Sequence, residues 1–158
     1  MANLFTASEV VQIAIQIERN GEVFYNALAS SADSERVKDL YAYLAGEERK
    51  HAEVFQKMLE AVGEYRPQES FPGEYDAYMS ALAESRVFTD DKAARDTASH
   101  AASPAEAIRI AQGAEKDSIL FYYEMRALVP EREHATMNRI IDEEKSHLRK
   151  LTELAKSL

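Results

Sequence analysis

The sequence contains no cysteine and no tryptophan, and it has few glycines and prolines for its 158 residues. The absence of cysteine excludes disulfides, thiolate metal ligands, and iron–sulfur or rubredoxin-type centres. No apolar run approaches the roughly 20 residues that a membrane-spanning helix needs. No basic segment followed by an apolar one marks a secretory leader. We therefore predict a cytoplasmic protein with no membrane partner.

Basic residues are scarce relative to acidic ones, with 19 lysines and arginines against 28 aspartates and glutamates. The resulting net charge of −9, without any basic run, is unsuited to binding nucleic acid and suited to binding cations. Hydrophobic residues make up 46% of the chain, which is enough for a packed core. The length predicts one domain over residues 1–158.

Four long segments carry apolar residues at a helical period. Thr6 and Glu9 can form a capping box before the first helix, and Ser103 followed by Pro104 is typical of the start of the third. Gly63 is placed to end the second helix. The expected helices cover about 7–29, the segment up to about 62, 104 to about 129, and 130 almost to 158.

The lengths of the connections predict how these helices are joined. Short breaks separate the two helices of each half, so residues 7–62 and 103–157 should each form an antiparallel hairpin. Residues 63–102 contain Pro67 and Pro72, and we expect them to form a crossover with a short helix at about 75–84. Two hairpins joined by one long crossover predict an all-α, ferritin-like antiparallel four-helix bundle.

The two hairpins resemble each other in sequence. The letters EERKH at residues 47–51 recur as EEKSH at residues 143–147. Glu18 stands at the same distance before a Phe-Tyr pair as Glu115 does in the other half. This internal repeat predicts an approximate two-fold axis within the bundle.

The repeated glutamates should meet in one layer. In an antiparallel hairpin, two residues equally far from the turn lie at the same height. The midpoint between Glu18 and Glu48 is Asp33, in the polar break at 30–34. The midpoint between Glu115 and Glu144 falls in the break at 129–130. Each glutamate interrupts an apolar stripe, and His51 and His147 share two of these faces. The predicted layer contains Glu18, Glu48, Glu115 and Glu144.

Four carboxylates in an apolar core require compensating cations. A bare buried charge is costly, and like charges add repulsion. Two divalent ions neutralise four carboxylates, and two imidazoles complete the ligand set. Oxygen and nitrogen ligands without thiolate suit iron or manganese, with zinc as another occupant. One glutamate from each of two helices plus Glu-x-x-His from each of the other two is the di-iron carboxylate pattern.

The chain resembles the rubrerythrin branch of the ferritin-like di-iron carboxylate superfamily, in a single-domain form without a rubredoxin tail. The resemblance spans nearly the whole chain and rests on IERNGEVFY, LAGEERKHAEVF, AEKDSILFYYE and IIDEEKSHLRKL. Rubrerythrins carry a further glutamate three residues after the third-helix ligand, where this chain has Ser118. The resemblance implies two iron ions with the ligands Glu18, Glu48, His51, Glu115, Glu144 and His147.

The resemblance also implies an activity. The expected protein is a non-haem di-iron oxidoreductase that reduces hydrogen peroxide or dioxygen. Because the chain has no cysteine and no flavin or haem motif, its electrons should come from an external donor such as a rubredoxin-like protein. The alternatives are a ferroxidase or iron-storage protein of the ferritin type, a hydroxylase with a substrate pocket beside the metals, and a metal-free helical adaptor. A homodimer is expected by analogy alone.

Tyr25 and Tyr122 lie two turns from predicted ligands on the same helix faces. Three roles stay open for them: core packing with a hydrogen-bonded hydroxyl, donation of a hydrogen bond to a ligand carboxylate, or redox activity of the phenol.

The remaining acidic and histidine candidates are placed outside the ligand set. Glu47 and Glu143 lie about 100° around their helices from the ligands, so we expect them at the surface or behind the ligands. Glu22 follows Glu18 by one turn but has no acidic counterpart in the second half. His134 should form a surface pair with the glutamate three residues before it, and His100 should be solvated.

Overall fold

The structure is a computed structural model that describes residues 6–66, 71, 73, 76–86, 88 and 90–158. Over these residues the chain is helical, without a strand, and none of the helices is long and apolar enough to cross a membrane. The elements in chain order are α1 (Ala7–Ser31), α2 (Glu35–Val62), α3 (Asp76–Ser85), α4 (Asp91–His100), α5 (Pro104–Leu128), the 3-10 helix η1 (Glu131–Glu133) and α6 (His134–Lys156).

The residues expected to begin or end helices do so at the start of α1, the start of α5 and the end of α2. Thr6 accepts a hydrogen bond from the backbone N–H of Glu9, and the Glu9 carboxylate accepts one from the backbone N–H of Thr6, which completes a capping box. At the start of α5, the Ser103 side chain accepts a hydrogen bond from the backbone N–H of Glu106, and proline occupies the beginning of the helix. Gly63 follows α2 with a φ of 53°, a conformation that favours glycine.

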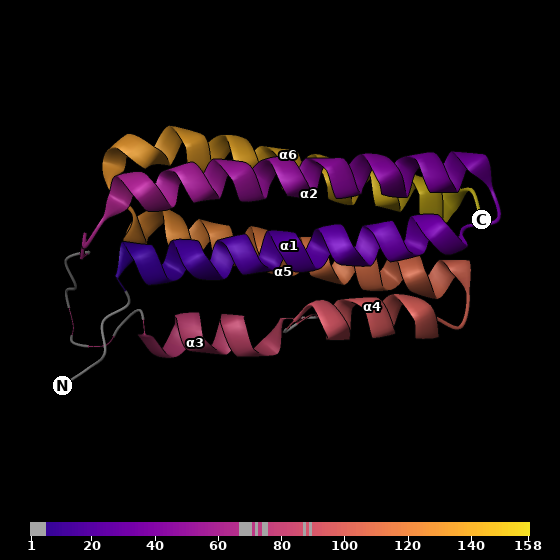
Figure 1. The fold of residues 1–158 in the computed structure, drawn as a ribbon, viewed down its shortest axis with the longest axis horizontal. Helices are drawn as coiled ribbons and strands as arrows, with labels where there is room; N and C mark the ends of the chain where they lie inside the picture. The colour runs from indigo at the N-terminus through magenta and orange to yellow at the C-terminus, as the bar shows by residue number, and fades with distance from the viewer. Residues whose placement is uncertain (1–5, 67–70, 72, 74–75, 87, 89) are drawn as a thin grey trace.

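The long helices form two antiparallel hairpins, α1 with α2 and α5 with α6, as Figure 1 shows. α1 lies beside α5, and α2 lies beside α6. α3 and α4 follow one another along the outside of α1 and α5 and return the chain from one end of the bundle to the other. The predicted all-α bundle of two hairpins with a long crossover is therefore confirmed.

Two local predictions need correction. The crossover contains a second short helix, α4, because Asp90 caps the backbone N–H of Ala93 and the small residues Ala94 and Ala98, one turn apart, are buried against the bundle. The fourth long helix also begins later than Pro130: the chain first makes the short turn η1, and α6 starts at His134.

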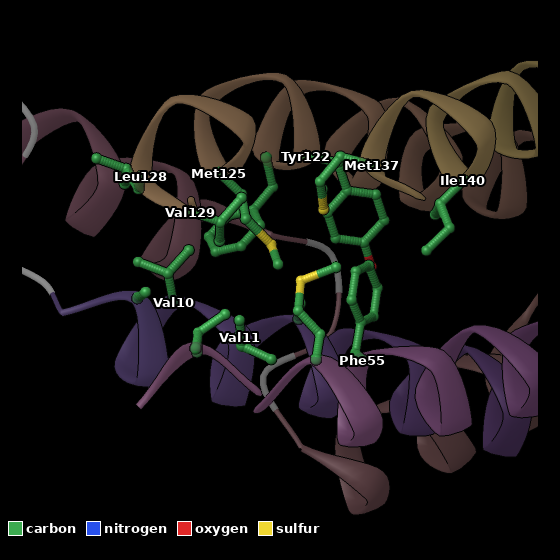
Figure 2. Close-up of a cluster of buried hydrophobic side chains, with 14 of the residues drawn as sticks. Val10, Val11, Phe55, Tyr122, Met125, Leu128, Val129, Met137 and Ile140 are labelled. Carbon is green, nitrogen blue, oxygen red and sulfur yellow. The ribbon is translucent and has the colours of Figure 1, made fainter. Parts of the chain in front are cut away.

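Two apolar clusters fill the bundle, one toward each end, with a polar layer between them. The first cluster lies where α1 and α6 begin and α2 and α5 end, and Figure 2 shows its side chains converging from both hairpins. The second lies at the opposite end, around Phe24, Leu44, Ile108 and Leu151. The labelled members of the first cluster are Val10, Val11, Phe55, Tyr122, Met125, Leu128, Val129, Met137 and Ile140.

Candidate metal centre

The polar layer contains all six residues that the sequence pattern predicts as ligands. One comes from α1, one from α5, two from α2 and two from α6. None of them is more than 5% exposed to solvent, although four are acids. Ionisable groups this deeply buried are rare in proteins unless they are paired or bind metal. The six residues are Glu18, Glu48, His51, Glu115, Glu144 and His147.

These residues divide into two groups that share members. The first group joins Glu18 and His51 to Glu48 and Glu144, and the second joins Glu115 and His147 to the same two glutamates. Within each group, one potential ligand atom per residue lies within 4.8 Å of every other. Because Glu48 and Glu144 belong to both groups, each can offer one oxygen to either side.

Three buried atoms indicate that the arrangement is built around something other than hydrogen bonds. His51 Nδ1 lies 2.8 Å from Glu144 Oε1 and 3.5 Å from Glu18 Oε2. None of these three atoms makes a hydrogen bond of acceptable geometry within the described chain. Buried polar atoms are nearly always hydrogen-bonded, so atoms that converge without such bonds fit a shared cation. The donor set of carboxylate oxygens and imidazole nitrogens is compatible with a di-iron centre.

The protonation of the metal-free layer reflects crowded negative charge. Burial and neighbouring carboxylates raise the pKa of Glu48 well above its usual range and raise the pKa of Glu115 to about 8. Burial lowers the pKa of each histidine, but the carboxylates outweigh it and raise the pKa of His51 to about 12 and of His147 to about 9. The same histidines overcome burial at Glu144 and lower its pKa. Without metal, the layer therefore holds protons as its counter-charge.

The two buried tyrosines connect the hairpins at this layer by hydrogen bonds. The Tyr25 hydroxyl, on α1, donates to Glu115 Oε1 on α5, and the Tyr122 hydroxyl, on α5, donates to Glu18 Oε1 on α1. Among the roles left open by the sequence, the geometry agrees with donation to a carboxylate. Each tyrosine therefore donates to the glutamate of the other helix. This reciprocal arrangement agrees with the approximate two-fold symmetry that the sequence repeat predicts.

One acidic residue departs from that symmetry. Glu143 Oε2 lies 2.8 Å from Nε2 of His51, while Nδ1 of the same ring faces the cluster. The counterpart Glu47 instead accepts a hydrogen bond from Lys50 at 2.6 Å. The Glu143 side chain is 41% exposed, so it links His51 to the surface. A carboxylate behind a histidine fixes which ring nitrogen is free to bind metal.

We expect Glu143→Gln to weaken metal binding at the His51 side by about 10- to 100-fold, because the loss of such an outer partner typically has this effect. Competitive titration of the metal-free protein with Zn²⁺ against a chelating dye measures both affinities. Glu153→Gln, an exposed change of the same kind on α6, is the matched control. Equal affinities for Glu143→Gln and the parent would show that Glu143 does not orient His51.

The other candidates from the sequence belong to neither four-residue group. Glu22 is 3.8 Å from Arg49, and His100 is exposed on α4. The expected surface pair of His134 is not the contact that the structure gives. Its Nε2 is instead 3.3 Å from the backbone carbonyl of Val129.

A small cavity lies against the layer on the side of α1 and α5 and was missed from the sequence. Carboxylates of Glu48 and Glu115 border it, and Leu82 and Phe88 from the crossover cover it. Its volume is about 30 Å³, which holds one or two water-sized molecules. No periodicity in residues 63–102 signals it, because it depends on where the crossover packs.

Comparison with known proteins supports this description. The family model described as Rubrerythrin matches residues 9–155. A Thermotoga maritima protein, whose crystal structure is described as ferritin-like and diiron-carboxylate, shares 31% identity at a TM-score of 0.69, over 97% of this chain and 96% of that one. A hypothetical protein from Pyrococcus furiosus shares the fold, with 21% identity and a TM-score of 0.65 over 96% of this chain and 89% of that one.

No curated protein matches the chain. The family match nevertheless covers nearly all of the sequence, and the Thermotoga maritima structure agrees with it over almost the full length of both chains. The chain belongs to the rubrerythrin family, within the ferritin-like di-iron fold.

Proposed function

We propose that the chain binds two iron ions and reduces hydrogen peroxide with electrons from an external donor. The observation that carries this proposal is the pair of buried four-residue groups that share Glu48 and Glu144. Glu18 and His51 would complete one ion's ligands, and Glu115 and His147 the other's. Zinc and manganese fit similar ligands. Zinc has no redox chemistry and would not support the proposed activity. Between the two redox-active metals, we choose iron because the similar Thermotoga maritima protein is described as diiron-carboxylate.

When bound as Fe²⁺, the two ions would supply the two electrons that, with two protons, convert hydrogen peroxide into two molecules of water. The chain's own contribution is to hold and shield the ligands. Tyr25 and Tyr122 orient Glu115 and Glu18 by hydrogen bonds. Burial raises the pKa of both phenols well above its usual value, so they stay protonated donors at neutral pH.

Both electrons must be replaced after each turnover. Among the described residues, the only clusters able to hold a metal are the two groups in this layer, and the sequence has no cysteine. The chain therefore needs a separate reductant, and a one-electron protein of the rubredoxin type fits if it acts twice. A homodimeric assembly and a cytoplasmic location remain part of the proposal.

Anaerobic loading with Fe²⁺ followed by separate mixing with peroxide and oxygen tests this activity. We expect binding to saturate at about two ions per chain, and one peroxide to oxidise both ions faster than oxygen does. Absorption in the near ultraviolet follows the oxidation, and elemental analysis gives the iron content. An iron-loaded protein that peroxide does not oxidise would contradict the proposal.

The same measurement distinguishes the alternatives. Faster oxidation by oxygen, with iron uptake continuing beyond two ions per chain, would indicate ferroxidase activity or storage. A hydroxylase would need space for an organic substrate beside the ions. The cavity at Glu48 and Glu115 is about 30 Å³, which favours a small oxidant over such a substrate.

A further inference from the structure

The cavity beside the polar layer lies on the face that carries no histidine. Both histidines come from α2 and α6, whereas the cavity lies between α1, α5 and the crossover. It contacts Glu48, which belongs to both four-residue groups, and Glu115, which belongs to one. A molecule in the cavity would therefore meet the centre directly, without passing the imidazoles.

Two small residues at equivalent positions of the repeat line the cavity. Gly21 follows Glu18 by three residues, as Ser118 follows Glu115. A Cβ atom at position 21 would lie 3.3 Å from both Cγ and Cδ of Glu48, closer than ordinary contact, so a side chain there would displace that carboxylate. The Ser118 hydroxyl donates to the carbonyl of Ala114 on its own helix.

The walls of the cavity suit a small guest. Apolar side chains, including Ile17, Leu82 and Phe121, form much of the lining. Besides Glu48 and Glu115, the lining includes a third acidic side chain, Asp117, and one cationic side chain, Arg86. Arg86 donates to the backbone carbonyls that neighbour it in the crossover, at 2.7 and 2.8 Å, which holds its guanidinium close to the protein.

We infer that this cavity is where a small oxidant, of the size of hydrogen peroxide or dioxygen, reaches the metal centre, and that its walls exclude organic hydroperoxides. The inference rests on the proposed function, because it assigns the oxidant's place in that reaction. Ser118 on α5 and Leu82 in the crossover both line the cavity, so a change of size at either residue should change the space inside it.

Filling the cavity from Ser118 tests access without turnover. Protein loaded with Co²⁺ is titrated with azide, a three-atom ligand, and the visible absorption of the cobalt reports binding. We expect Ser118→Leu to keep two ions and to bind azide at least about tenfold more weakly, because overfilling a packed space typically has an effect of this size. Ser99→Leu on α4 loses the same kind of serine-to-carbonyl hydrogen bond at an exposed position and should bind azide normally.

Widening the cavity gives an independent test that does not depend on Ser118. The iron-loaded parent protein should react at least about tenfold more slowly with cumene hydroperoxide than with hydrogen peroxide. Leu82→Ala should reduce this difference between the two rates. The inference is overturned by equal azide affinity in Ser118→Leu and the parent, by a loaded parent that binds no azide, or by a parent that does not distinguish the two peroxides. If the parent protein binds no metal, or if no peroxide oxidises its iron, the result contradicts the proposed function and not this inference.

Discussion

Glu144→Ala should abolish binding of both metal ions, whereas Glu18→Ala should leave one. Glu144 belongs to both four-residue groups, so its loss removes a ligand from each ion, while Glu18 belongs to one group. We expect each affected affinity to fall by more than the roughly 100-fold that loss of an outer partner can cause. Elemental analysis after loading and gel filtration measures the ratio of metal to protein.

The control for these variants is Glu153→Ala, which removes an exposed carboxylate from the same helix as Glu144. It should retain two ions. Circular dichroism of the metal-free proteins verifies that each variant is folded. Two ions in Glu144→Ala would mean that the shared carboxylate is not a ligand, and equal losses in Glu144→Ala and Glu18→Ala would contradict the sharing.

The stabilisation that metal gives should increase as the pH rises from about 5 to about 9. In the metal-free protein, Glu115 has its pKa raised from 4.5 to about 8, and His147 from 6.5 to about 9. Groups whose pKa is raised on folding stabilise the fold at low pH and lose that effect as the pH passes the folded value. Glu144, whose pKa is lowered, acts in the opposite sense but below this window.

Metal ions replace these protons, because ligand imidazoles and carboxylates bind in their deprotonated forms. We therefore expect the melting temperature of the metal-free protein to fall across the window while that of the loaded protein changes little. At a fixed metal concentration, about 100 times the Kd at pH 9, each ion should raise the melting temperature by roughly 5 to 10 °C at that pH and by less at lower pH. Thermal melts at several pH values, with and without Zn²⁺, measure the difference.

Glu144→Ala provides the matched control, because its melting temperature should not respond to Zn²⁺ at any pH. A metal-induced shift in the parent that is constant from pH 5 to pH 9 would contradict the view that protons and metal compete for the same layer.

The four long helices could be predicted because each signal is local. Thr6 and Ser103 cap helices through residues three positions away, and Gly63 ends α2 with a positive φ. The short helix α4 was not predicted, because its sequence is mostly polar and its only apolar residues are alanines, whose burial depends on their fit against α1. Pro130 marks a break, but sequence alone does not tell a 3-10 turn from the start of an α-helix.

The convergence of the six buried residues followed from geometry that the sequence contains, since paired spacings around two turns place them at one height. The hydrogen bond from His51 to Glu143 did not follow. Glu143 and Glu47 occupy equivalent positions in the repeat, but Glu47 pairs with Lys50 instead of a histidine. The repeat alone does not predict this difference. The cavity at Gly21 and Ser118 likewise depends on the crossover that covers it.

The most direct test is an anomalous difference map from crystals of the iron-loaded protein, recorded at the iron absorption edge. The account predicts two peaks inside the bundle, one among Glu18, Glu48, His51 and Glu144, and the other among Glu48, Glu115, Glu144 and His147. A map without peaks at this layer, or with iron only at the protein surface, would contradict it.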